Sequence, residues 1–230
     1  MTQRLAVLTD LALRIEGLRI SHPLRVAVDG RTASGKTTLA DELATLLRDR
    51  KRHVIRTSID GFHNPRAVRY ARGRQSAEGY YYDARDLPAI NTLLLMPLGP
   101  GGDRHYRTAS FDLDNDVPIT QASQVAPADT VLIVDGTFLQ RPELRDNWDV
   151  TIFVDTTADI SEQRGISRDL SQLGGAEATR QLYANRYRPA FELYDRLSNP
   201  ALAADAVLDN NDLDRPRLTV RLGGRLASKQ

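Results

Sequence analysis

Hydrophobic positions along the chain fall into two kinds of spacing, one typical of helices and one typical of buried strands. A helix within residues 1–20 is predicted by apolar residues at three- and four-residue intervals, namely Leu8, Leu11, Ile15 and Leu18. Similar spacing predicts a second helix through Leu39, Leu43, Leu46 and Leu47. Short apolar runs predict buried strands, and these lie at 24–29, 54–59, 131–134, 150–154 and 206–208.

The second half of the chain adds two more helices. Thr157 can cap a helix that runs to about Leu170, and Leu173-Gly174-Gly175 would end it. A further helix, bent by Pro189, is predicted from an aromatic face that consists of Tyr183, Tyr187, Phe191 and Tyr194. The tail from Arg215 is expected to be peripheral.

Strands that alternate with helices predict an α/β protein, because a mostly parallel sheet needs helices on both faces. The expected fold is a three-layer α/β/α sandwich. Two segments do not fit this alternation. Residues 62–83 have no clear period and are rich in Arg and Tyr, which suggests a functional loop, and residues 104–125 are expected to form a pair of exposed strands.

The junction between the first strand and the second helix carries a phosphate-binding loop. Gly30-x-x-x-x-Gly35-Lys36-Thr37 follows an apolar strand and precedes an amphipathic helix, the context that this pattern requires. Backbone N–H groups of such a loop and the helix N-terminus bind phosphate oxygens, so ATP is the expected co-substrate. The predicted nucleotide-binding residues are Gly30, Arg31, Thr32, Ala33, Ser34, Gly35, Lys36, Thr37 and Thr38.

Asp135, at the end of the apolar run 131–134, is the candidate partner of Thr37 in holding Mg²⁺. The alternative is that Asp135 only caps its strand. The loop by itself does not distinguish a kinase from a GTPase or a motor ATPase. An Asn-Lys-x-Asp segment that would read guanine is absent from the sequence, which disfavours the GTPase.

Several segments together resemble the uridine kinase family, a branch that also includes phosphoribulokinases and type I pantothenate kinases. The resemblance runs from about Leu24 to Asn210. Beside the phosphate-binding loop, it rests on Ser58-Ile59-Asp60-Gly61-Phe62, Tyr82-Asp83, the segment 127–136, Val154-Asp155-Thr156, Arg164-x-x-x-Arg168-Asp169 and Tyr187-Arg188-Pro189-Ala190-Phe191.

The resemblance implies roles for individual residues. Asp60 would be the catalytic aspartate that orients the acceptor hydroxyl, although it could simply cap the second strand. Arg164 and Arg168, one helical turn apart, would close over the transferring phosphate with Lys36, although they could be solvated arginines. The implied substrate contacts are His63, Tyr82, Asp83 and Phe111.

The resemblance also implies how the chain is divided. Residues 1–230 would form a single domain of the phosphate-binding-loop kinase type, with an N-terminal helix at 1–20 and a core at 24–60 and 86–158. A substrate flap with a small hairpin would comprise 61–85 and 104–125, and a helical lid would lie at about 160–190.

The sequence departs from the uridine kinase pattern at three places on the substrate side. Ala84-Arg85 replaces the usual His-Pro, a histidine expected after Phe111-Asp112 is missing, and Leu173-Gly174-Gly175 replaces an arginine-rich stretch. These departures leave the identity of the acceptor open. The expected reaction is phosphorylation of a hydroxyl on a small metabolite, and uridine or cytidine is the first acceptor expected. Pantothenate, a sugar or another vitamin-like alcohol is the alternative acceptor. A regulatory module that binds ATP without transferring phosphate is the other class.

Composition limits the partners. Lys and Arg total 31 against 30 for Asp and Glu, and this near-neutral balance disfavours nucleic acid, despite the Arg- and Tyr-rich segment 66–81. There is no cysteine, and Arg4, Arg14 and Arg19 interrupt the apolar residues of the first helix, unlike a signal peptide. A cytoplasmic protein without membrane contact is expected. The sequence is compatible with a homo-oligomer.

Overall fold

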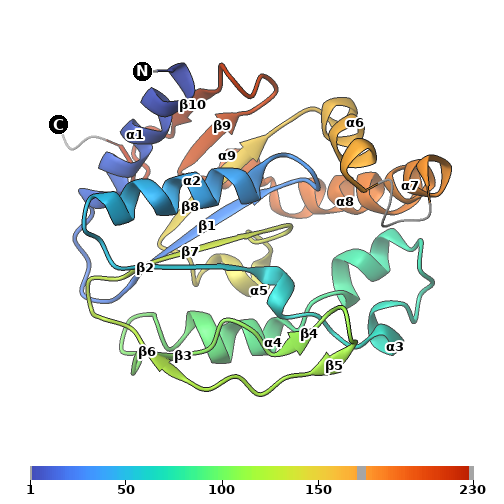
Figure 1. The fold of residues 1–230 in the computed structure, drawn as a ribbon, viewed down its shortest axis with the longest axis horizontal. Coiled ribbons are helices and arrows are strands. Elements are labelled where there is room, and N and C mark those ends of the chain that lie inside the picture. Colours follow the sequence, from blue (N-terminus) through green and yellow to red (C-terminus); the bar gives the residue numbers. More distant parts are fainter. Residues whose placement is uncertain (1, 170–174, 228–230) are drawn as a thin grey trace.

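In the computed structural model, which describes residues 2–169 and 175–227, a six-stranded sheet forms the centre of the molecule (Figure 1). The strands are β1 (Leu24–Gly30), β2 (Val54–Ser58), β7 (Val131–Gly136), β8 (Val150–Asp155), β9 (Ala206–Asp209) and β10 (Arg217–Val220). Their order is β10-β9-β8-β1-β7-β2. All neighbours are parallel except β9 and β10. The mostly parallel sheet expected from the alternation is confirmed.

Both faces of the sheet are buried. Successive side chains of a strand point to opposite faces, so neighbouring residues of one strand pack in different clusters. Val26 and Val28 of β1 pack with the helices α1 (Gln3–Glu16) and α2 (Lys36–Asp49). Ala27, between them, packs on the other side with a cluster that contains Phe62 and Leu94. The three-layer α/β/α arrangement follows directly from this alternation.

The N-terminal helix is shorter than the interval 1–20. Thr2 caps α1 by accepting a hydrogen bond from the Leu5 N–H at 3.3 Å, and the helix ends at Glu16, before Gly17. Its buried face is the predicted one, since Leu11 and Ile15 are fully buried against the core. The C-terminal tail is not peripheral, and that prediction was wrong.

Two parts of the tail complete the core beside α1. The strand β10 pairs with β9, and Leu218 and Val220 pack against the same cluster as α1. Leu226, further along, is only 2% exposed. These few apolar residues hold the C-terminal tail against the core, although charged residues lie around them in the sequence.

Residues 59–125, which include the predicted substrate flap, consist of short elements. They are α3 (Arg66–Arg69), the π-helical turns η2 (Gly79–Asp83) and η3 (Asn91–Leu95), α4 (Leu87–Ile90) and the 3₁₀ turn η1 (Ile59–Gly61). Instead of one hairpin, residues 104–125 form two antiparallel pairs. In these, β3 (His105–Tyr106) joins β6 (Gln124–Val125), and β4 (Phe111–Asp112) joins β5 (Val117–Pro118).

Helices at one end of the molecule occupy the segment for which a lid is predicted (Figure 1). They are α6 (Ala158–Asp169), α7 (Ala176–Leu182), η4 (Tyr183–Tyr187) and α8 (Arg188–Ser198), followed by the short α9 (Pro200–Ala203). The predicted break at Leu173-Gly174 lies outside the described residues, and Gly175 precedes α7. Pro189 is in the first turn of α8, two residues after the end of the π-helical turn η4, and regular helical hydrogen bonding is interrupted at this junction. The short helix α5 (Pro142–Arg145) follows β7. No described helix is long and apolar enough to cross a membrane.

Candidate active site

The phosphate-binding loop joins β1 to α2 in a conformation that requires glycine at both ends. Gly35 has φ of 90°, and a Cβ there would lie 2.5 Å from Asn210 Nδ2. A Cβ on Gly30 would lie 2.7 Å from the carbonyl oxygen of Val154. No described side chain caps the N-terminus of α2. Its first N–H groups and its partial positive charge are therefore free to bind a phosphate.

Three neighbouring strands end beside this loop. In the parallel register, Val28 of β1 pairs with Asp135 of β7, and Asp135 pairs with Ser58 of β2. Lys36 extends from the loop, where its Nζ donates to the Arg31 carbonyl at 3.1 Å. The sheet thus places the loop, Asp135 and the turn after β2 at one edge, the usual ligand-binding edge of a parallel sheet.

Thr37 and Asp135 form a pair of oxygen ligands suited to Mg²⁺. The Thr37 hydroxyl donates to Asp135 Oδ2 at 2.5 Å. Asp135 Oδ1 is buried without a hydrogen-bond partner in the described part of the chain, although Arg56 Nη1 approaches it to 2.7 Å out of hydrogen-bonding alignment. A carboxylate with one oxygen unsatisfied, next to a hydroxyl and a phosphate-binding loop, fits Mg²⁺, which prefers few carboxylates together with phosphate oxygens and water.

Asp60 lies in η1, directly after β2, and its carboxylate is 63% exposed to the cavity described below. Arg85 Nη2 donates to Asp60 Oδ1 at 2.6 Å. The pKa of Asp60 is below its usual value. The surrounding protein partly removes Asp60 from bulk water and so raises this pKa, although the side chain is open to the cavity. The positive charge of Arg85, with smaller effects from His63 and Lys36, outweighs that increase. Asp60 is therefore an ionised hydrogen-bond acceptor.

His63 is held between Asp60 and Arg85. Its Nδ1 donates to the Asp60 carbonyl oxygen at 2.8 Å, and its Nε2 faces Arg85 Nη1 as an acceptor. Burial, followed by the charge of Arg85, lowers the pKa of His63 to about 4. The hydrogen bonds and the pKa agree, because a ring that donates at one nitrogen and accepts at the other is neutral.

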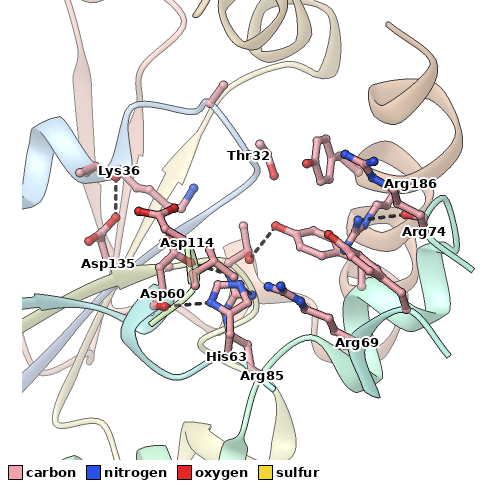
Figure 2. A pocket seen from close by; sticks show the side chains of 18 of the residues that line it. Thr32, Lys36, Asp60, His63, Arg69, Arg74, Arg85, Asp114, Asp135 and Arg186 are labelled. Atoms are coloured by element: carbon pink, nitrogen blue, oxygen red, sulfur yellow. Dashed lines mark hydrogen bonds and ion pairs between the residues drawn. The ribbon is translucent and has the colours of Figure 1, made fainter. Parts of the chain in front are cut away.

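These groups line one cavity of about 540 Å³ (Figure 2). Sequence-predicted residues in its wall are Thr32, Ala33, Lys36, Thr37, Asp60, His63, Asp135 and Arg168. Arg168 is 61% exposed and pairs with Asp169 at 2.6 Å. The structure therefore brings the phosphate-binding side and the predicted catalytic aspartate together in one space.

Four residues that were predicted to contact the substrate or to close over the phosphate do not line this cavity. Arg164 donates to the carbonyl oxygens of Asn210 and Asn211 at 3.0 and 2.8 Å. Asp83 is held by Arg72 at 2.8 Å. Tyr82 is 44% exposed, and Phe111 is buried. The substrate and lid roles assigned to these four residues stay predictions.

The cavity also contains residues to which the sequence assigned no site role. Arg85 was recognised only as a departure from the His-Pro pattern, and that departure was the available signal. Arg186, in η4, carried no signal in its own segment. Seven cationic and three acidic side chains line the cavity among the described residues. The cations are Lys36, Arg66, Arg69, Arg74, Arg85, Arg168 and Arg186, and the acids are Asp60, Asp114 and Asp135.

Comparison with known proteins gives a family for most of the chain. The sequence model described as Phosphoribulokinase / Uridine kinase family matches residues 26–208. A uridine-cytidine kinase B of Dictyostelium discoideum is 29% identical over 177 residues, which cover 75% of this chain and 70% of that protein. A uridine kinase of Lactobacillus helveticus is 23% identical over 209 residues, covering 89% of this chain and 96% of that protein.

A solved structure agrees with the fold. The structure described as a possible uridine kinase from Bacillus stearothermophilus superposes with a TM-score of 0.70 at 25% identity, covering 88% of this chain and 98% of that one. The resemblance inferred from the sequence motifs and the α/β/α fold are both confirmed by these similarities.

Proposed function

Because this chain belongs to the phosphoribulokinase/uridine kinase family, we propose that it transfers the γ-phosphate of ATP to an alcohol hydroxyl of a small molecule. One observation carries the proposal. Lys36, Asp135 and the ionised Asp60 line the same cavity, so a phosphate donor and a hydroxyl acceptor can meet within it. Phosphoryl transfer requires positioning and charge stabilisation more than covalent catalysis, and this wall provides both.

On the donor side, the loop N–H groups and Lys36 bind the β- and γ-phosphates. Thr37 and Asp135 would hold Mg²⁺, and the ion would supply positive charge that neutralises the phosphates. Arg168 approaches the transferring group from the lid, and Arg164 supports the lid from its contacts with the 210–211 segment. Positive charge that is held in place before the reaction stabilises the transition state without further reorganisation.

On the acceptor side, Asp60 accepts a hydrogen bond from the hydroxyl and orients its oxygen toward the γ-phosphorus. The new O–P bond forms as the bond from that phosphorus to the β–γ bridging oxygen breaks. ADP leaves with the electron pair of the broken bond, and the hydroxyl proton passes to Asp60. Arg85 keeps Asp60 ionised until then.

The names of the relatives favour a nucleoside, uridine or cytidine, as the first acceptor to test. Pantothenate, a sugar and another vitamin-like alcohol are the alternatives within the same reaction. An ATP-binding regulatory module without transfer is the alternative outside it. The ionised Asp60 in the cavity supports the enzyme over the module, because binding of ATP alone needs no carboxylate on the acceptor side.

The test is ADP formation with Mg²⁺ and ATP across nucleosides, pantothenate and sugars, with a reaction that lacks an acceptor as the baseline. We expect Lys36→Ala to abolish turnover. Asp60→Asn is expected to keep ATP binding and to lower kcat by about 10²–10⁴-fold, the usual contribution of a general base. Asp146→Asn, whose side chain is 89% exposed on the surface, is the matched control.

Two outcomes would contradict the proposal in different ways. Full activity of Asp60→Asn would remove Asp60 from the mechanism. ADP formation that no acceptor stimulates would instead favour the module that binds or hydrolyses ATP without transfer.

A further inference from the structure

Three arginines form a cationic wall at one end of the cavity, away from the phosphate-binding loop. This arginine cluster consists of Arg69 in α3, Arg74 and Arg186 in η4. Arg69 and Arg186 each lie 5.2 Å from the ring centroid of Tyr70, and Arg186 Nη1 donates to the Arg74 carbonyl at 2.9 Å. Figure 2 shows the cluster on the far side from Lys36 and Asp135.

The charge of this cluster is incompletely compensated. Arg186 is 6% exposed, and within the described residues no carboxylate lies within ion-pair distance of it. Arg69 is 5% exposed and has one carboxylate partner, Asp116 at 2.7 Å. The Nε atoms of Arg69 and Arg186 are both buried without a hydrogen-bond partner among the described residues. Buried charges normally have partners, because removing them from water is costly.

Aromatic rings compensate Arg186 only in part. Its guanidinium lies 4.8 Å from the Tyr80 ring centroid and 5.8 Å from that of Tyr187, in addition to Tyr70. These rings fix the plane of the guanidinium, but a cation–π contact leaves the N–H donors at its edge unused. A rigid, partly unsatisfied guanidinium that faces a cavity is suited to bind an oxyanion.

We propose that the acceptor alcohol itself carries an oxyanion, a carboxylate or a phosphate, and that Arg69, Arg74 and Arg186 bind it. This inference rests on the phosphoryl transfer proposed above and names the substrate class. In Figure 2 Asp60 lies beside Asp135, on the Lys36 side of the cavity, and the cluster lies across the cavity from it. An acceptor whose hydroxyl is at Asp60 therefore extends its anion toward the cluster. The nucleotide phosphates have their own site at Lys36 and the start of α2.

The arrangement disfavours a neutral nucleoside. The residues that the family resemblance assigned to a nucleoside, Tyr82 and Asp83, lie outside the cavity wall, and Arg72 holds the Asp83 carboxylate. Cations outnumber acids in the described wall, which suits the combined negative charge of ATP and an anionic acceptor. A neutral acceptor would leave the buried charge of Arg186 uncompensated in the ternary complex.

The test compares acceptors that differ in charge. The matched pairs are pantothenate with pantothenol, glycerate with glycerol, and ribose 5-phosphate with ribose, and uridine is the neutral nucleoside. We expect an anionic member to stimulate ADP formation with kcat/KM at least about 100-fold above its neutral partner, as expected for a charge-assisted bidentate contact. The pair that responds distinguishes a carboxylate from a phosphate. Uridine or another neutral alcohol as the best acceptor would overturn the inference and leave the kinase proposal intact.

Variants of the cluster provide a second measurement. Arg186→Gln is expected to raise the KM for the anionic acceptor by about 10–100-fold with a smaller change in kcat. Arg74→Gln changes an exposed side chain and serves if Arg186→Gln does not fold. The control is Arg196→Gln, an exposed arginine of α8 that is outside the cavity wall. An unchanged KM in both cluster variants would contradict the inference.

Binding of inorganic phosphate tests the site without turnover. With Mg·ADP saturating the nucleotide site, millimolar phosphate should raise Tm relative to chloride at equal ionic strength, and Arg74→Gln and Arg186→Gln should remove this shift. If phosphate binds in this way but no acceptor is phosphorylated, the anion site stands and the kinase proposal fails. A phosphate shift that both variants retain would overturn the anion site.

Discussion

His63 shows how the cavity controls the charge of a single residue. It is 9% exposed, it donates one hydrogen bond to the Asp60 carbonyl oxygen, and Arg85 approaches its other nitrogen. A proton on that nitrogen would face the Arg85 guanidinium inside a buried site. For this reason the pKa of His63 falls to about 4, and the ring stays neutral while Asp60 and Arg85 remain charged.

This neutral ring predicts a loss of stability in acid. An unfolded histidine binds a proton below about pH 6.5, whereas folded His63 does so only below about pH 4, so the unfolded state binds more protons between these values. The free energy of unfolding therefore decreases as the pH falls through this window, by at most about 3 kcal/mol. Urea denaturation at a series of pH values measures it.

The comparison of variants isolates His63. His63→Gln should show a weaker decrease between pH 6.5 and 4 than the wild type. His105→Gln, which removes an exposed histidine of β3, should follow the wild type. Parallel curves for His63→Gln and the wild type would mean that His63 is protonated equally in the folded and unfolded chains.

At the residue scale, the sequence predicted the functional residues that belong to short, recognisable motifs. Lys36, Thr37 and Asp135 belong to a loop and a strand end whose spacing is visible in the chain. Arg186 could not be predicted in this way. Its role depends on Tyr70 and Arg74, more than a hundred residues earlier, and only the packing of η4 against that segment brings them together.

At the element scale, the strands that contain an apolar run were predictable, and the edge strand β10 was not. Every residue of β1 and β7 is buried, and each strand contains an apolar run, 26–28 in β1 and 131–134 in β7. In β10, partly buried Leu218 and Val220 alternate with exposed Arg217 and Thr219. Four alternating residues are too few to distinguish an edge strand from a surface tail, which explains the error about the C-terminal segment.

The lid depends on a close helix contact at Gly165 of α6. A Cβ on Gly165, in the predicted lid, would overlap the phenol of Tyr183 in η4, whose hydroxyl donates to Asp169 at 3.3 Å. Gly165→Ala should therefore lower the free energy of unfolding by about 1–3 kcal/mol, the usual cost of overpacking. This outcome is opposite to the gain of about 1 kcal/mol that alanine normally gives inside a helix.

A second glycine provides the matched control. Gly17, directly after α1, has φ of −68°, and a Cβ there would lie at an ordinary contact distance of 3.4 Å from the Arg14 carbonyl oxygen. Gly17→Ala should leave stability unchanged or raise it by up to about 1 kcal/mol. Chemical denaturation measures the free energy of unfolding of both variants. Equal values for Gly165→Ala and Gly17→Ala would show that α6 and η4 move apart at little cost.

At the scale of the whole molecule, the order of the strands brings the site together. The strand β1 lies between β7 and β8, and β7 lies between β1 and β2, so the ends of β1, β7 and β2 are neighbours. The alternation of elements in the sequence predicted the layers, because each buried strand requires cover on both faces. It did not determine this order, which depends on contacts between elements far apart in the chain.

The same connectivity predicts that nucleotide binding stabilises the entire chain as one unit. Mg·ADP at about 100 times its Kd adds about 2.7 kcal/mol, which corresponds to a rise in Tm of about 5–10 °C for a chain of this size, and Lys36→Ala should abolish the rise. The single tryptophan, Trp148, is 7% exposed and donates to the Leu139 carbonyl at 2.7 Å, in the layer opposite α2. Its fluorescence should therefore shift together with far-ultraviolet circular dichroism. A rise in Tm seen by circular dichroism but not at Trp148 would mean that the layers unfold separately, and the prediction of a single domain over residues 1–230 would be wrong.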